Sequence, residues 1–300
     1  MLNAPGKYLD LRFSPDGRRL AMSLLDAKLE TDVWVYEYQR DTTSRLTFGA
    51  ADNFRPVWTP DGLRLAFASD RAKRGLANIY WQRADGTGEA QRLTEGDNPQ
   101  SPSSWHPSGR FLAFTETNPQ TALDIMILPM EGSEAGGWKA GKPFVFLNGP
   151  SNEGRPQFSP DGRWIAYMSD ESGRFEIYVR PFPGPGGRWQ VSTNGGLWPS
   201  WSPKGKELFY EEVSSSRIMV AAYAASGSEF QPEKPRPWAS NSVPLLQGVN
   251  SPLDVSPDGK RLAVLLKTPD QSQRPVKEDR ITFLFNFTDE LHRIVPTGKK

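Results

Sequence analysis

The 300-residue chain contains no cysteine and only two histidines, which limits the chemistry it can carry. Without cysteine it forms neither a disulfide nor a thiol-based site. A Ser–His–Asp triad would have to use His106 or His292, and neither belongs to a His-Glu-x-x-His zinc pair. A Gly-x-Ser-x-Gly nucleophile elbow is also missing. The composition therefore disfavours the common nucleophilic and zinc-dependent hydrolases.

The chain also lacks an excess of either charge and a long apolar run. Lys and Arg number 36 against 35 Asp and Glu, a net charge of +1. A nucleic-acid surface would need a basic excess on one face, so we expect no nucleic-acid partner. No apolar run approaches the ~18 residues that span a membrane, so we expect no direct membrane insertion. The first residues do not form a signal peptide, and they reach the first repeat at once, as in an excised domain.

One short phrase occurs six times: an apolar, usually aromatic residue, Ser or Thr, Pro, Asp and Gly, followed by an apolar run that usually contains Ala. The third copy has His and Ser instead, and the fifth has Lys in place of Asp. Successive turn prolines are 45, 47, 53, 43 and 54 residues apart. A period of this length indicates a solenoid or a propeller. The prolines are Pro15, Pro60, Pro107, Pro160, Pro203 and Pro257.

Each copy of the phrase predicts a β-hairpin, because Pro and Gly suit a tight turn and apolar runs flank it. A third apolar strand follows each hairpin, and a shorter fourth closes most units. Four strands per repeat are typical of a propeller blade. We therefore predict an all-β fold, a six-bladed β-propeller of four-stranded antiparallel blades, as a single domain over residues 1–300. The sixth repeat shows three clear strands, so its fourth must come from residues 291–295 or from the N-terminus near Leu2.

The repeats resemble those of TolB-like, WD-repeat-like β-propellers over nearly the whole chain. Residues 167–174, 178–193 and 284–299 are further similar to the propeller attached to bacterial receptor-type serine/threonine kinases, although Phe287 stands where Trp is expected. This resemblance implies a sensor or interaction module, often outside the cytoplasmic membrane. It carries no kinase activity here, since the chain has no Gly-rich phosphate loop, His-Arg-Asp or Asp-Phe-Gly motif.

Loops that enter the first strand of each blade should share one face with the loops between the second and third strands. Binding residues commonly lie on such loops of a rigid scaffold. Arg55 and Arg155 precede prolines at matching positions, and Trp198 stands at a similar place. An arginine grips a carboxylate through two parallel hydrogen bonds, and Trp offers a large rigid contact. The predicted ligand-binding residues are Asn53, Arg55, Asn98, Glu153, Arg155, Trp198 and Asn250.

Each of these features has an alternative interpretation. Arg55 and Arg155 can pair with carboxylates of a neighbouring blade, and His106 can serve the turn that contains it. Asp70 and Asp170 can cap turns instead of holding a metal. The favoured function is a non-catalytic sensor or binding module for a protein or peptide, without a cofactor. The alternative is a hydrolase or lyase that uses channel carboxylates and Ca²⁺.

Overall fold

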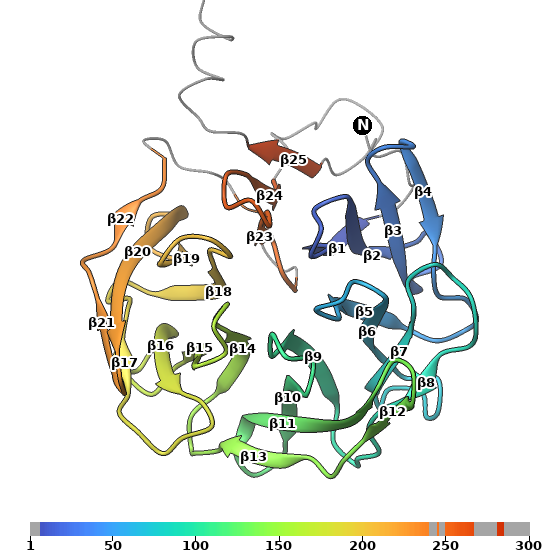
Figure 1. Ribbon diagram of the computed structural model, residues 1–300, viewed down its shortest axis with the longest axis horizontal. Coiled ribbons are helices and arrows are strands. Elements are labelled where there is room, and N and C mark those ends of the chain that lie inside the picture. Colours follow the sequence, from blue (N-terminus) through green and yellow to red (C-terminus); the bar gives the residue numbers. More distant parts are fainter. Residues whose placement is uncertain (1–6, 240–244, 246–249, 267–280, 285–300) are drawn as a thin grey trace, which may run out of the picture.

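The computed structural model describes residues 7–239, 245, 250–266 and 281–284, and of 281–284 it describes only the backbone. These residues form 25 β-strands in six antiparallel sheets around a common centre (Figure 1). The described part contains no helix, so it offers no helical segment able to cross a membrane.

The sheets are numbered one to six in chain order. The first holds β1 (Lys7–Phe13), β2 (Arg19–Leu25), β3 (Thr31–Glu37) and β4 (Thr42–Arg45); the second holds β5 (Asn53–Trp58), β6 (Arg64–Ser69), β7 (Asn78–Arg83) and β8 (Gln91–Arg92). The third holds β9 (Gln100–Trp105), β10 (Phe111–Asn118), β11 (Ala122–Ser133), β12 (Gly137–Ala140) and β13 (Phe144–Leu147). The fourth holds β14 (Glu153–Phe158), β15 (Trp164–Ser169), β16 (Glu176–Pro181) and β17 (Trp189–Gln190). The fifth holds β18 (Gly196–Trp201), β19 (Glu207–Glu212), β20 (Arg217–Ser226), β21 (Glu229–Pro232) and β22 (Arg236–Pro237), and the sixth β23 (Leu253–Val255), β24 (Leu262–Leu265) and β25 (Ile281–Leu284).

The repeated phrase forms the hairpin between the first two strands of each sheet, as predicted. In the first copy Ser14 Oγ donates to Asp16 Oδ1 (2.6 Å), which also accepts from the Arg18 amide (3.0 Å), while Gly17 takes a φ of +69°. His106 occupies the Ser position of the third copy, where its Nδ1 lies 2.7 Å from Ser108 Oγ. The interpretation of His106 as a turn residue is therefore confirmed.

The core lies between neighbouring sheets. An alanine of the second strand is fully buried in five of the six sheets, where it allows the sheets to approach closely. These alanines are Ala21, Ala66, Ala113, Ala166 and Ala263.

The prediction of four strands in every blade is wrong for the third and fifth sheets. Each has a fifth strand, because its third strand continues past the sheet into a hairpin, β11–β12 or β20–β21. These hairpins account for the two longest spacings between turn prolines, 53 and 54 residues.

The sixth sheet contacts the first. The Phe13 amide donates to Asp254 Oδ2 (2.8 Å), and the Asn250 amide donates to the Leu9 carbonyl (2.9 Å). Three strands of the sixth sheet are described. The two segments considered for a fourth strand, Leu2 and residues 291–295, lie outside the described residues.

Candidate functional site

Arg55, Arg155 and Trp198 occupy the same position in β5, β14 and β18, five residues before the turn proline. Each has a left-handed backbone, with φ of +56°, +58° and +52°. The strand pairing shifts register at each of these residues, which marks a β-bulge. A left-handed non-glycine residue costs ~1–3 kcal/mol, and such strain concentrates at functional sites. The repeated bulge therefore makes this position a candidate for a functional role.

Arg55 reaches across the centre of the molecule. Its Nη1 donates to Ser101 Oγ, and its Nη2 donates to Asn250 Oδ1 (3.3 Å). Its backbone amide donates to Asp10 Oδ2 (3.1 Å). These partners belong to the third sheet, the segment before the sixth sheet, and the first sheet. Arg55 therefore lies inside the channel.

The Arg155 guanidinium makes no hydrogen bond or ion pair with the described residues, although its backbone amide donates to Thr115 Oγ1 (3.2 Å). Arg55 also forms no ion pair within this part of the chain. Among the described residues, therefore, neither arginine forms the ion pair with a neighbouring blade that the alternative interpretation predicts.

The two guanidiniums lie in one electrostatic environment. Burial lowers the pKa of Arg55, and burial followed by the like charge of Arg55 holds the pKa of Arg155 well below its usual range. Asp10 opposes both shifts. Since a guanidinium remains protonated in proteins, these lowered pKa values indicate that the positive charges are incompletely compensated.

Asp10 is the acidic residue of this channel layer and stands at the position of Arg55 in the first repeat. It is 1% exposed, and its Oδ2 also accepts from Asn250 Nδ2 (3.3 Å). Its Oδ1 has no hydrogen-bond partner among the described residues. One buried carboxylate thus faces two arginine side chains.

Two cavities lie along the channel. An inner cavity of only about 10 Å³ is lined by Asp10, Arg55 and Arg155, among others. A larger one of about 470 Å³, the turn-side cavity, lies at the end where all six turn prolines gather. Arg12, Val57, Ser103 and Gln157 line both cavities, so the inner cavity lies next to the turn-side cavity.

Residues three positions before the turn proline supply polar groups to the turn-side cavity. Arg12 Nη1 donates to Ser251 Oγ (2.7 Å) and lies 3.8 Å from Asp254 Oδ1. Gln157 and Ser200 stand at the same position of their repeats and line the same cavity. Sequence reasoning missed this layer, although its constant offset from the turn proline was available.

The other predicted ligand-binding residues are placed differently. Asn53 is fully buried and bonds Asp32, Arg71 and the Ala51 carbonyl. Asn98 donates to Glu116 Oε1 (3.3 Å). Trp198 is partly buried, and Asn250 bridges Arg55 and Asp10. The structure brings together Arg55 and Arg155 in the inner cavity, and Asn250 joins them through its hydrogen bond with Arg55. Asn53, Asn98 and Trp198 line neither channel cavity.

Glu153 lies outside both channel cavities, at the junction of the third and fourth sheets. It is 4% exposed, and its Oε2 has no hydrogen-bond partner among the described residues. Burial, followed by the like charge of Asp124, raises its pKa to about 7. The corresponding junction between the first and second sheets pairs an acid with an amide, Asp32 with Asn53.

The loops that enter the first strands do share a face with those between the second and third strands. Asp70 Oδ1 accepts from the Asp52 amide (2.9 Å), and Asp170 Oδ1 accepts from the Asn152 amide (2.8 Å). Capping of these loops by Asp70 and Asp170 is thus confirmed. Across the described ranges, no three Asp, Glu or His side chains gather as a metal site.

Comparison with known proteins gives the fold a name. A family model described as the TolB beta propeller domain matches residues 1–136. A structure from Agrobacterium tumefaciens designated TolB aligns with a TM-score of 0.62 at 20% identity, over 85% of this chain and 88% of that chain. This chain has a TolB-like β-propeller fold.

The TolB-like fold also occurs in proteins named as peptidases. The chain is 26% identical over 208 residues to the uncharacterized peptidase YuxL of Bacillus subtilis (strain 168), covering 57% of this chain and 31% of that protein. It aligns with a puromycin-hydrolyzing peptidase of Mycobacterium tuberculosis with a TM-score of 0.60 at 16% identity, over 95% of this chain and 43% of the peptidase. The chain therefore spans less than half the length of either protein.

Proposed function

We propose that this chain is a non-catalytic recognition propeller that binds a carboxylate of a protein or peptide in its channel. The observation that carries the proposal is the pair of channel arginines, Arg55 and Arg155, held on strained bulges without an ion-pair partner among the described residues. An anionic group would compensate both charges. Two guanidiniums also offer several parallel N–H donors, which suits a planar carboxylate.

In the proposal the peptide occupies the turn-side cavity and directs its carboxylate toward the inner cavity. Because the inner cavity has room for about one water molecule, the side chains of Arg55 and Arg155 must shift to admit the carboxylate. The turn-side cavity, with its volume of about 470 Å³, accommodates a few residues of a peptide, and its lining includes Trp58, Trp105 and Trp201. Aromatic walls supply contact area at little cost in conformational entropy. Arg12, which lines both cavities, would meet the ligand before Arg55 and Arg155.

We further propose that the six sheets are the blades of one closed ring and one domain. Hydrogen bonds of Phe13 with Asp254 and of Leu9 with Asn250 support closure. The role suggested for such a ring is a sensor or interaction module of the kind attached to bacterial receptor-type kinases.

The alternative is a hydrolase or lyase with Ca²⁺ in the channel, and the alignment with part of a peptidase supports only the shared fold. Such a site needs several carboxylates around one ion. The described channel presents Asp10 and Asp254 with three arginines, Arg12, Arg55 and Arg155. This balance of charge favours an anionic ligand over a cation.

The test compares two pools of fluorescently labelled random pentapeptides, one with free C-terminal carboxylates and one amidated, by fluorescence polarisation. We expect the free acids to bind and the amides to bind at least about tenfold more weakly. Arg155→Gln should remove this preference. Arg40→Gln, a substitution of an arginine side chain that is 75% exposed, should keep it. Equal binding of acids and amides, or an unchanged preference in Arg155→Gln, would contradict the proposal.

A further inference from the structure

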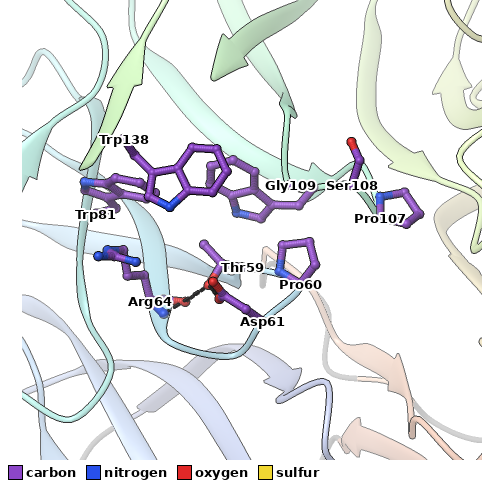
Figure 2. A pocket seen from close by; sticks show the side chains of 10 residues that line it. Thr59, Pro60, Asp61, Arg64, Trp81, Pro107, Ser108, Gly109 and Trp138 are labelled. Carbon is purple, nitrogen blue, oxygen red and sulfur yellow. Dashed lines mark hydrogen bonds between the residues drawn. The ribbon is translucent and has the colours of Figure 1, made fainter. Parts of the chain in front are cut away.

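A pocket of about 350 Å³ lies between the second and third sheets, beneath the β11–β12 hairpin. Figure 2 shows Trp81 and Trp138 on one side of it and Thr59, Pro60 and Asp61 on the opposite side. Trp81 stacks on Trp105, with ring centroids 6.1 Å apart and planes inclined by 25°. The indole rings of Trp81, Trp105 and Trp138 therefore form part of its wall.

The same architecture occurs a second time in the molecule, two sheets further along. The β20–β21 hairpin of the fifth sheet corresponds to β11–β12 of the third. In the β20–β21 hairpin Phe230 pairs with Ala225, and in the β11–β12 hairpin Trp138 pairs with Gly132. The two junctions can therefore be compared position by position.

At the junction of the fourth and fifth sheets, this place is filled. Phe230 is 1% exposed, and its ring lies 5.2 Å from that of Trp164 and 6.1 Å from that of Trp189. Trp201 and Tyr223 complete the cluster at 6.1 and 4.9 Å from Phe230. The hairpin thus closes over a packed group of aromatic rings.

At the junction of the second and third sheets, three of those rings are missing, and Met130 takes the place of Tyr223. Arg64 begins β6, where Trp164 begins β15, and Gln91 begins β8, where Trp189 begins β17. Arg64 is drawn aside: its guanidinium lies 4.9 Å above the Trp81 ring and forms a two-fold contact with Glu134 of the hairpin, at 2.5 and 3.1 Å. The Gln91 side chain accepts from Trp81 Nε1 at 3.1 Å. The pocket is the space that this exchange leaves open.

We propose that this pocket binds a planar aromatic ring supplied by a ligand. The filled junction shows which chemistry fits this place, namely indole and phenyl rings at centroid distances of 5 to 6 Å, the range that aromatic pairs prefer. A dry cavity of ~150 Å³ accepts a benzene ring, so about 350 Å³ is ample for an indole. Thr59, Asp61 and Ser108 at the edge of the pocket provide polar groups for a ring N–H or hydroxyl.

The aromatic pocket adjoins the turn-side cavity, since Pro60, Trp105 and Pro107 line both. It nevertheless does not depend on carboxylate binding in the channel, because none of Arg12, Arg55 and Arg155 lines it. Binding of an aromatic ring can therefore succeed or fail independently of the proposed function.

The test titrates the full chain with N-acetyl-tryptophanamide by calorimetry, beside a capped pentapeptide that carries one central Trp and its Trp→Ala counterpart. We expect saturable binding of both Trp probes and none of the Ala peptide. A peptide at least about tenfold tighter than the amide identifies a polypeptide as the source of the ring, and equal affinities identify a small aromatic molecule. Either result supports the pocket.

Two variants locate the binding. Arg64→Trp places in the pocket the ring that Trp164 places at the filled junction, and it should weaken binding at least about tenfold. Leu63→Trp adds the same ring at a residue that does not line the pocket, and it should leave affinity unchanged. If Arg64→Trp fails to fold, Trp138→Ala, which removes one wall, must weaken binding to the same degree. Failure of the Trp probes to bind below about 10 mM, or undiminished binding in the informative variant, would overturn the proposal.

Discussion

At the scale of single residues, the chain contrasts two kinds of buried charge. Asp32 accepts hydrogen bonds from Thr47 Oγ1 (2.6 Å), Arg45 and Asn53, so its oxygens are satisfied within the fold. Glu153 Oε2 is buried and has no hydrogen-bond partner among the described residues, and the guanidinium of the partly buried Arg155 forms no hydrogen bond with them. Hydrogen-bonded charges such as Asp32 stabilise the structure. Charges without a partner cost free energy of folding, and such residues are candidates for a role in function or regulation.

Glu153 should make the protein less stable as the pH rises. Its pKa is about 7 in the folded protein against an ordinary value of 4.5, because of burial and the negative charges of Asp124, Glu171 and Asp170, which outweigh Arg180. Between pH 4.5 and 7 the folded state therefore holds a proton that the unfolded state has lost, and the free energy of unfolding falls across this window. Glu153→Gln should remove this fall. Melting temperatures of both proteins from pH 4 to 8 check it, and parallel pH profiles would show that Glu153 does not titrate in this way.

The arginine positions could be predicted from the sequence because Arg-Pro recurs at one offset from the turn proline. Asp10 has the same offset, but Leu11 follows it where the other two have proline, so the pattern did not include it. The sequence analysis also did not predict that Glu153 and Asp124, two carboxyl groups of like charge, lie close together. Which charges face one another across a junction depends on how neighbouring sheets pack, and the repeat of a single strand does not contain that information.

At the scale of strands, the turn phrase determined hairpins correctly because its hydrogen bonds are local. Ser14, Asp16 and Gly17 lie within four residues of one another. The hairpin extensions β11–β12 and β20–β21 were not predicted. Their sequences contain Gly and charged residues typical of loops, whereas in the structure Trp138 and Phe230 anchor them to core clusters.

The two hairpins should differ in their contribution to stability. Phe230→Ala removes a ring that is 1% exposed and packs on Trp164, Trp201 and Tyr223, and it should lower the free energy of unfolding by ~3–5 kcal/mol. Trp138→Ala should cost less, because Trp138 is only partly buried and borders an open pocket. Urea unfolding of the two variants provides the comparison. A larger loss of unfolding free energy in Trp138→Ala than in Phe230→Ala would contradict the view that the junction of the second and third sheets is open and that of the fourth and fifth is packed.

At the scale of the whole molecule, Asp254 links the sixth sheet to the first. It accepts from the Phe13 amide and lies near Arg12, and burial raises its pKa. Asp254→Ala leaves the amide and Arg12 without this partner, and it should destabilise the protein by ~2–4 kcal/mol. Asp97→Ala is the control, because Asp97 is exposed and its side chain forms no hydrogen bond or ion pair with the described residues.

Hydrogen exchange measures whether this loss concerns ring closure. In Asp254→Ala, amides of β1 and β23 should exchange faster than those of β14 to β16, on the far side of the ring (Figure 1). Uniformly faster exchange across all sheets would indicate a general loss of stability without a weakened closure.

The most direct test of an uncompensated charge in the channel is the melting temperature of Arg155→Met at low salt, without added ligand. Met roughly conserves the length of the side chain and removes its charge, and with it the repulsion from Arg55. We expect the variant to melt a few degrees above the wild type, since ~1 kcal/mol corresponds to about 2–4 °C in a chain of this size class. A variant that melts lower would show that Arg155 stabilises the fold and is not held there for a ligand.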